Sequence, residues 1–215
     1  MPGLHEYLLF TAAGLLLNIT PGADMLYVMT NAARYGHGRG IVSALGVFTG
    51  TLVHIALAVV GLSAMLAASA WAFSVVKYLG AAYLAYLGLR LLFARPQARG
   101  PIGPALLPES TPGRFKVFRD GALINLLNPK ITLFFVAFLP QFIVPGAPDQ
   151  ALAFAVLGLT FNITGTAVNC LAALSVVSLA RLSFTHRIRS VMQRSVGALF
   201  VALGVRLAIT GHAAD

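Results

Sequence analysis

The sequence predicts an all-α integral membrane protein with six transmembrane helices, arranged as two inverted three-helix repeats whose first helices are broken. Three observations lead to this prediction. The 215 residues are 58% hydrophobic and 10% charged, whereas a soluble domain carries about 25% charged residues. Apolar runs recur along the chain, and basic residues gather in alternate connections between them. The two halves of the chain also share a weak similarity, with the same features in the same order.

The apolar runs supply the six spans. Each run is long enough, alone or with its flanks, to approach the ~20 residues that cross a bilayer as a helix. The first segment extends from about Leu4 to Ala33 and contains a polar interruption. The other runs cover about residues 41–67, 71–93, 131–144, 151–180 and 196–209. The fourth helix is expected to start near Gly121, after a short stretch, residues 115–121, that lies on the membrane surface.

The net charge of +9 is distributed in a way that argues against a nucleic-acid partner. Basic residues occupy the first, third and fifth connections, whereas the second and fourth contain no Lys or Arg. Basic alternate loops follow the positive-inside rule. We therefore expect a multi-pass protein of the plasma (inner) membrane with basic loops in the cytoplasm and both termini outside. The basic residues are Arg34 and Arg39; Arg95, Arg99, Arg114, Lys116 and Arg119; and Arg181, Arg187, Arg189 and Arg194.

The internal similarity predicts one transporter domain, residues 1–215, built from two repeats. The segment "YLGAAYLAYLGLRLLFA" (78–94) resembles "SVGALFVALGVRLAIT" (195–210). Repeat one covers about 1–94, a cytoplasmic Pro/Gly-rich linker about 95–119, and repeat two about 120–211. Three spans per repeat is an odd number, so the repeats must insert in opposite orientations. Inverted repeats with paired broken helices are typical of secondary transporters.

Each repeat opens with a helix broken by proline. Pro21 lacks an N–H, so the carbonyl of Leu17 loses its helical partner, and Pro129 does the same to the carbonyl of Asn125. In lipid an unpaired backbone group costs several kcal/mol, so such breaks persist only against protein or a wet cavity. Replacement hydrogen-bonding groups lie close to both breaks, namely Asn18, Thr20, Asn125 and Asn128. Both breaks are expected near the bilayer midplane.

Two ionisable residues follow the breaks. Asp24 lies one turn after the first and Lys130 immediately after the second. A central Asp or Lys costs about 2.5–3.5 kcal/mol on insertion scales, so such residues indicate functional sites. Two interpretations are open for both residues. They bind substrate, with Asp24 also a candidate for carrying a coupled proton, or they form a structural ion pair or cap the restarted helices.

Other polar residues of the apolar runs have two interpretations. Histidine is the side chain whose ordinary pKa lies near neutral pH, so His54 is a second candidate for proton coupling; the other interpretation is that it packs through a hydrogen bond. Asn162 and Asn169, seven residues apart, are interhelical hydrogen-bonding residues or ligands. Gly46 and Gly50 have the G-x-x-x-G spacing that lets two helix backbones approach closely. No cofactor or metal is expected, because the single Cys170 and the scattered histidines form no cluster and no P-loop is present.

Four segments resemble the LysE/RhtB family of amino-acid exporters. "TPGADML" (20–26) resembles the family's Pro-Gly-Pro-Asp motif, and "GHGRGIVSALGVFTGTLVH" (36–54) its glycine-rich entry to helix two. "VKYLGAAYLAYLGLRLL" (76–92) resembles helix three. "FRDGALINLLNPKITLFFVAFLPQF" (118–142) resembles the fourth-helix motif and is the most specific of the four. Ala23 stands where the family usually has a second proline, so the first break is expected to be less rigid.

The resemblance implies that the protein is not an enzyme but exports amino acids or close derivatives, driven by protons or the membrane potential. The expected substrate-binding residues are Asn18, Thr20, Gly22, Asp24, Asn125, Asn128 and Lys130. The half-helix starting near Gly22 would direct its positive dipole end at a substrate carboxylate. A passive channel or facilitator for a small polar solute, a metal-ion exporter and a non-transporting membrane scaffold or enzyme are the alternatives. A homodimer is compatible with the small-residue helix faces.

Overall fold

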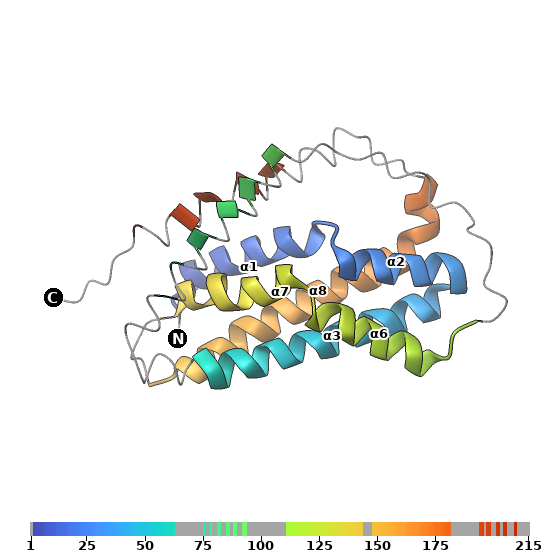
Figure 1. The fold of residues 1–215 in the computed structure, drawn as a ribbon, viewed down its shortest axis with the longest axis horizontal. Coiled ribbons are helices and arrows are strands. Elements are labelled where there is room, and N and C mark those ends of the chain that lie inside the picture. The colour runs from blue at the N-terminus through green and yellow to red at the C-terminus, as the bar shows by residue number, and fades with distance from the viewer. Residues whose placement is uncertain are drawn as a thin grey trace.

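The computed structural model describes residues 2–62, 111–143 and 148–181, together with separate helical positions between 75 and 93 and between 194 and 209. Every regular element in these residues is helical, as predicted. The third and sixth expected spans fall mainly on the separate positions, and linker residues 95–110 lie outside the described residues. Figure 1 shows the helices lying lengthwise beside one another as an elongated bundle.

The first half of the chain contains a bent helix pair followed by a long helix. α1 (Leu4–Ile19) and α2 (Ala23–Tyr35) meet at an angle of 49°. α3 (His37–Leu57) follows and continues into a short π-helix, η1 (Ala58–Leu62). The predicted interruption of the first helix at Pro21 is therefore confirmed as a bend between two helices.

The second half repeats this order. α6 (Arg114–Leu126) and the segment 129–142 meet at 47°. That segment comprises α7 (Pro129–Leu133), a π-helix η2 (Phe134–Phe138) and a 3-10 helix η3 (Leu139–Phe142). α8 (Gln150–Arg181) follows. In Figure 1, α1–α2 and α6–α7 run in opposite directions, as do α3 and α8.

Four membrane spans fit the described part of the chain at most. His37–Gly61 and Gln150–Ser175 are each long and apolar enough to cross a bilayer. Each bent pair passes the same length and composition test only as a unit, as a broken span or a re-entrant loop.

Helix α6 begins earlier than expected. It starts at Arg114 and incorporates the stretch 115–121 that was predicted to lie separately on the membrane surface. The reason is packing against α3, since Val117 is 2% exposed and Gly121 contacts the carbonyl of Ser43. Phe115 on the opposite face is 77% exposed.

The predicted close approach at Gly46 and Gly50 is confirmed, and its partner is α6. A Cβ atom built on Gly46 would overlap the carbonyl of Phe118, and one built on Gly50 would lie 2.7 Å from the carbonyl of Ala122. The two backbones therefore touch along this seam. A similar contact joins two of the separate helical positions, because a Cβ on Gly88 would lie 2.6 Å from the carbonyl of Gly197.

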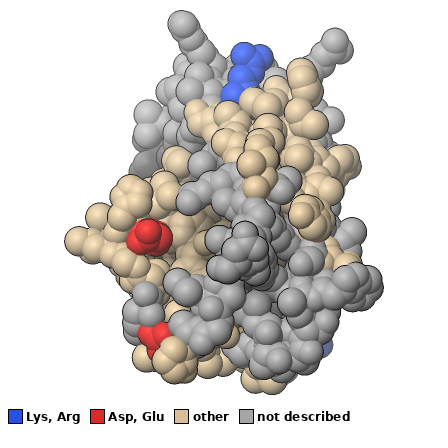
Figure 2. Space-filling view, turned by 90° about the vertical axis from the view of Figure 1, so that its left-hand side faces the viewer, with Lys and Arg blue, Asp and Glu red and all other residues tan. Residues whose placement is uncertain are grey.

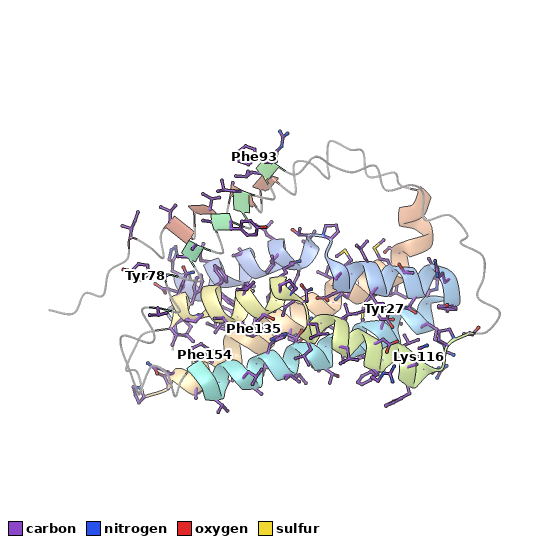
Figure 3. The ribbon with its side chains drawn as sticks, in the orientation of Figure 1. Tyr27, Tyr78, Phe93, Lys116, Phe135 and Phe154 are labelled. Atoms are coloured by element: carbon purple, nitrogen blue, oxygen red, sulfur yellow. The ribbon has the colours of Figure 1, made fainter. Side chains whose placement is uncertain are left out.

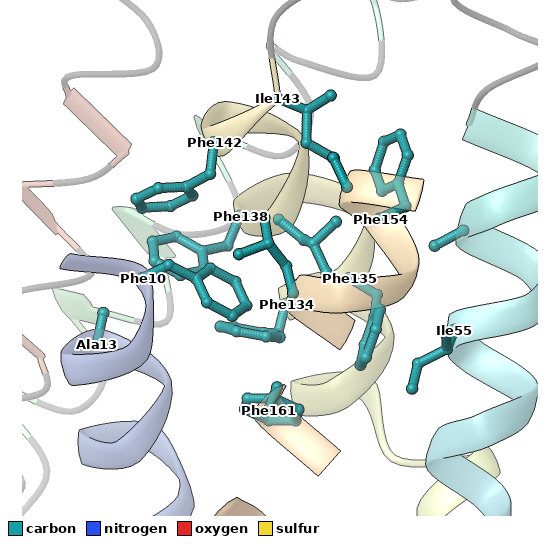
Figure 4. Close-up of a cluster of buried hydrophobic side chains, with 14 of the residues drawn as sticks. Phe10, Ala13, Ile55, Phe134, Phe135, Phe138, Phe142, Ile143, Phe154 and Phe161 are labelled. Carbon is teal, nitrogen blue, oxygen red and sulfur yellow. The ribbon is translucent and has the colours of Figure 1, made fainter. Parts of the chain in front are cut away.

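The two ends of the bundle differ in composition. α2 ends, and α3 and α6 begin, at the same end, which carries basic residues such as Lys116 (Figure 3). In the view from the opposite end the described side chains are mostly uncharged, with isolated acidic groups and a basic group at the upper edge (Figure 2). Towards that opposite end, phenylalanine side chains from α1, the segment 129–142 and α8 form the main hydrophobic core (Figure 4).

Candidate functional site

The first break is stabilised by a lysine from the second. The carbonyl of Leu17, four residues before Pro21, accepts a hydrogen bond from the backbone N–H of Thr20 at 3.2 Å. The Lys130 ammonium donates to the same carbonyl at 2.9 Å and to the carbonyl of Thr20 at 3.0 Å. A cation at a helix C-terminus also interacts favourably with the helix dipole. Lys130 therefore caps α1.

The second break follows the same arrangement. The carbonyl of Asn125, four residues before Pro129, accepts the backbone N–H of Asn128 at 2.9 Å and His54 Nε2 at 3.4 Å. The side chain of Asn128 caps α7 by accepting the N–H of Lys130 at 3.0 Å. At both breaks, a carbonyl that proline deprives of its helical partner is thus bound by a nearby N–H and by a basic side chain from another helix.

Asp24 lies in the first turn of α2 and is bound by the second break. Its side chain is buried, with the residue 9% exposed. Its two carboxylate oxygens accept hydrogen bonds from Asn125 Nδ2 and Asn128 Nδ2, each at 3.1 Å. The two amides are held in this orientation because Asn125 Oδ1 accepts the Thr51 hydroxyl at 3.2 Å and Asn128 Oδ1 accepts the Lys130 N–H.

The alternative of an Asp24–Lys130 ion pair is not what the structure shows. Both residues are described, and no ion pair joins them. Each charge is instead bonded to the opposite break, the carboxylate to two amides of the second and the ammonium to two carbonyls of the first. The breaks are therefore connected by four hydrogen bonds, each of which involves a charged group.

A cavity of about 20 Å³ lies between the breaks and α8. A site needs about 10–15 Å³ to hold one water molecule, so the cavity accommodates a water or a small ion and no amino acid. Its apolar lining is Val47, Ile131, Phe161 and Gly165, and its polar lining is Asn18, Asp24, Thr51, Asn125, Asn162, Thr166 and Asn169.

Helix α8 contributes a polar face to this cavity. Asn162, Thr166 and Asn169 follow one another at helical spacing. Asn162 donates to the carbonyl of Phe48 at 3.2 Å, which is the interhelical role considered for it from the sequence. Asn169 is 7% exposed, and its side chain has no hydrogen-bond partner among the described residues. The two asparagines that the sequence could not distinguish therefore differ in their bonding.

Asn18 is held by the same helix. Its Nδ2 donates to the carbonyl of Phe161 at 3.1 Å and to the Thr164 hydroxyl at 3.2 Å. Gly165 provides the space, since a Cβ atom there would lie 2.9 Å from Asn18 Oδ1. The amide oxygen of Asn18 accepts no hydrogen bond from the described residues, and Asn18 is one of the residues that line the cavity.

The residues predicted from the sequence occupy two positions relative to the cavity. Asn18, Asp24 and Asn125 line it. The other four predicted residues belong to the surrounding breaks. Lys130 caps α1 by donating to the carbonyl of Thr20, and Asn128 donates to Asp24. Gly22 is the N-cap residue of α2. His54 lies behind Asn125 and stacks on Phe135 with ring centroids 5.9 Å apart.

Six lining residues were missed by the sequence reasoning: the polar Thr51 and Thr166, and the apolar or small Val47, Ile131, Phe161 and Gly165. Thr51 lies one residue after Gly50, on the helix whose glycine spacing had been recognised. Thr166 lies between the two asparagines of α8, four residues after the first. A polar position at helical spacing between two amides was the available signal for it.

A group of stacked phenylalanines closes the cavity on the side away from the basic end. Phe161 lines the cavity and stacks on Phe134 with centroids 4.2 Å apart. Phe134 in turn contacts Phe10 and Phe138, at 5.7 and 4.9 Å between centroids (Figure 4). In the described residues, no group of three His, Cys, Asp or Glu side chains is placed to hold a metal ion.

Comparison with known proteins gives a family match over most of the chain. The model of the LysE type translocator matches residues 15–211. An uncharacterized membrane protein of Pseudomonas aeruginosa is 33% identical over 208 residues, 96% of each chain. The leucine efflux protein of Salmonella typhimurium is 30% identical over 212 residues, 96% of each chain. The homoserine/homoserine lactone efflux protein of that organism is 32% identical over 198 residues, 92% of this chain and 93% of the relative. No solved structure matches the chain.

Proposed function

Because this chain belongs to the LysE type translocator family, we propose that it exports amino acids or close derivatives across the plasma membrane by secondary active transport. Relatives that cover nearly the whole chain are named efflux proteins for leucine and for homoserine and its lactone. The observation that carries the proposal is the buried carboxylate of Asp24, which lines a cavity between two broken helices. This is the arrangement in which transporters bind substrates near the bilayer midplane.

The proposed architecture is the six-helix inverted repeat. Its support is the equivalence of the two breaks. In each, the carbonyl four residues before proline is bound by the N–H of the residue directly before proline and by a basic side chain. The bends are similar, 49° and 47°, and the two pairs run in opposite directions (Figure 1). With the basic connections in the cytoplasm, both termini lie outside.

In the proposed site, Asp24 binds the substrate ammonium. Part of its acceptor capacity is free, because a carboxylate has about four lone-pair sites and two are used by Asn125 and Asn128. In this proposal the substrate carboxylate lies at the start of α2. The N-cap residue there, Gly22, has no side chain to cap the helix, and the N–H groups of the first turn favour an anion. Asn18 supplies a further amide at the cavity wall.

The structure corresponds to a closed state in this proposal. A cavity of about 20 Å³ admits no amino acid, so binding requires the two breaks to separate. The hydrogen bonds from Asn125 and Asn128 to Asp24 are those that substrate would replace. Alternating access then follows from one repeat rocking against the other. We propose protons or the membrane potential as the driving force, with Asp24 or His54 as the residue that would carry a coupled proton.

Counterflow in liposomes tests this function. Purified protein in liposomes loaded with unlabelled amino acid is expected to accumulate the same labelled amino acid, saturably and with preference for one group. Asp24→Asn keeps the size of the side chain and removes its charge, so we expect it to abolish counterflow. Asp120→Asn is the matched control, because Asp120 pairs with Arg119 on the surface at 2.9 Å and does not line the cavity.

The outcomes separate the proposal from its alternatives. A passive channel would equilibrate solute without counterflow, and a scaffold or enzyme would show no flux. Wild-type counterflow in Asp24→Asn would remove Asp24 from the substrate site. Absence of counterflow for every amino acid tested, in folded wild-type protein, would refute the exporter.

A further inference from the structure

Away from the cavity, one buried polar atom is left without a partner. Nη1 of Arg39 is buried and has no hydrogen-bond partner among the residues that the structure describes. A guanidinium carries five N–H donors and keeps its charge inside a protein. Leaving a charged donor buried and unsatisfied is costly, and native proteins satisfy such groups with a protein acceptor, a water or an ion. The side chain of Arg39 therefore calls for an acceptor.

The acidic side chains of the described residues do not supply this acceptor. At the basic end of the bundle, the described acid is Asp120, and it pairs with Arg119 at 2.9 Å. The remaining described acids lie at the opposite end or at the breaks, and they are Glu6, Asp24 and Asp149. An anion from outside the described chain is therefore needed to neutralise Arg39.

Arg39 lies beside the start of α6. It precedes Gly46 by seven residues, or two turns, so both residues are on the same face of α3. Gly46 touches α6, because a Cβ atom built on it would overlap the carbonyl of Phe118. α3 and α6 both begin at the basic end, and α6 starts at Arg114, one turn before Phe118. Following the seam back from Gly46 therefore leads to Arg39 on α3 and to the first turn of α6.

The first turn of α6 favours an anion and faces lipid. Its N-cap residue, Gly113, makes no side-chain cap bond, and the N–H groups at the start of a helix attract negative charge. Arg114 and Lys116 are exposed in this turn, and Lys116 is labelled in Figure 3. Phe115 between them is 77% exposed. Exposed bases that flank an exposed aromatic ring are typical of the boundary between headgroups and acyl chains.

From this juxtaposition we infer that Arg39 and the start of α6 bind the phosphate group of an anionic phospholipid in the leaflet at the basic end. The planar fork of a guanidinium matches the oxygens of a phosphate. Basic pockets between membrane helices are places where lipid headgroups bind. A zwitterionic lipid would bring its own positive charge close to Arg114 and Lys116, so an anionic headgroup is preferred.

This lipid site is separate from the cavity. Arg39 precedes Thr51, which lines the cavity, by twelve residues of α3, or about 18 Å. A bound phosphate would hold the start of α6 against α3, at the outer end of the seam that continues to Gly50 and Asn125. The inference does not rest on the exporter function.

Unfolding of the purified, lipid-depleted full-length chain in detergent tests the inference. The unfolding temperature is measured while phosphatidylglycerol is added to the micelles, and in parallel while phosphatidylcholine is added. We expect a saturable rise with the anionic lipid that exceeds the rise with the zwitterionic one. Arg39→Gln removes the charge and should increase the half-saturating fraction of phosphatidylglycerol at least about tenfold, as for the loss of a hydrogen bond between charged groups.

Arg34→Gln is the matched control, because it removes the same charge from the same end of the bundle. Arg34 is exposed in the last turn of α2. This variant should keep the wild-type half-saturating fraction of phosphatidylglycerol. Since each protein is compared with itself in phosphatidylcholine, a destabilised variant still reports on the site.

Several results would overturn the lipid site. They are equal rises with the two lipids, an unchanged response in Arg39→Gln, and an equal loss of response in Arg34→Gln. The same rise with inorganic phosphate and no lipid would keep the phosphate site and overturn the lipid as its source. Glu109, which lies outside the described residues, is the rival partner from the chain itself. If Glu109→Gln lowered the unfolding temperature of the wild type but not that of Arg39→Gln, Glu109 would be the partner and the lipid site would be overturned.

The exporter proposal is tested separately, by counterflow. Loss of the lipid response would leave the exporter proposal untouched, because these unfolding measurements involve no transport. Lipid binding in a protein without counterflow of any amino acid would refute the exporter alone.

Discussion

Replacing Gly50 by alanine tests the link between the α3–α6 seam and the site. The added Cβ would lie 2.7 Å from the carbonyl of Ala122 and 2.8 Å from Asn125 Oδ1. Ordinary contacts of carbon are near 3.5 Å, so α6 must move away from α3 by most of an ångström. The first of these contacts is with a backbone carbonyl, so a change of side-chain rotamer cannot relieve it.

The magnitude follows from what this movement costs. Overpacking of a close contact typically costs about 1–3 kcal/mol, and alanine returns up to about 1 kcal/mol of helix propensity. We expect the free energy of unfolding to fall by about 1–2 kcal/mol. The hydrogen bonds of Asn125 to Thr51 and Asp24, now 3.2 and 3.1 Å, would lengthen, and counterflow should weaken together with stability.

Gly38→Ala is the matched control, because it lies in the same helix and a Cβ there meets no atom within 4 Å. Its stability should equal or exceed that of the wild type. Both variants are compared with the wild type by denaturant titration in the same detergent, and by counterflow in liposomes. If Gly50→Ala were as stable and as active as Gly38→Ala, the argument that backbone contact at this seam positions Asn125 would be refuted.

Two further substitutions separate support of the breaks from contact with substrate. Lys130→Met leaves the Thr20 carbonyl without its described partner, so denaturant titration should show that the free energy of unfolding falls by about 1–3 kcal/mol. Unchanged stability with a raised KM would instead make Lys130 a substrate contact. Thr51→Val removes the hydroxyl that orients Asn125, a hydrogen bond of about 1 kcal/mol, so the free energy of unfolding should fall by about 1 kcal/mol and KM for counterflow should rise about fivefold. An unchanged KM would show that Asn125 keeps its orientation without Thr51.

Some features of the site are local consequences of the sequence. Pro21 and Pro129 each remove one backbone donor, whatever surrounds them, so both breaks could be placed from the sequence. The identity of the two carbonyls left without helical partners, Leu17 and Asn125, follows from the same rule. The glycine spacing at Gly46 likewise predicted a close helix contact without identifying the partner helix.

The partners across the bundle could not be predicted in this way. Asp24 is bound by Asn125 and Asn128, which lie 101 and 104 residues further along the chain. Lys130 reaches back to α1 rather than to Asp24. The sequence left an ion pair and separate caps as alternatives, because both satisfy a charge in lipid and only the relative position of the two breaks distinguishes them.

The sequence by itself determined that the chain is helical, apolar and broken at two prolines, since composition and the missing proline N–H act wherever the residues are placed. The tertiary structure decided which groups meet. It placed Asn162 against the carbonyl of Phe48 and left Asn169 unpaired beside the cavity, although both are asparagines of the same helix face. Their difference arises from the packing of α8 against α3 and the breaks, a long-range property that residue type and spacing do not contain.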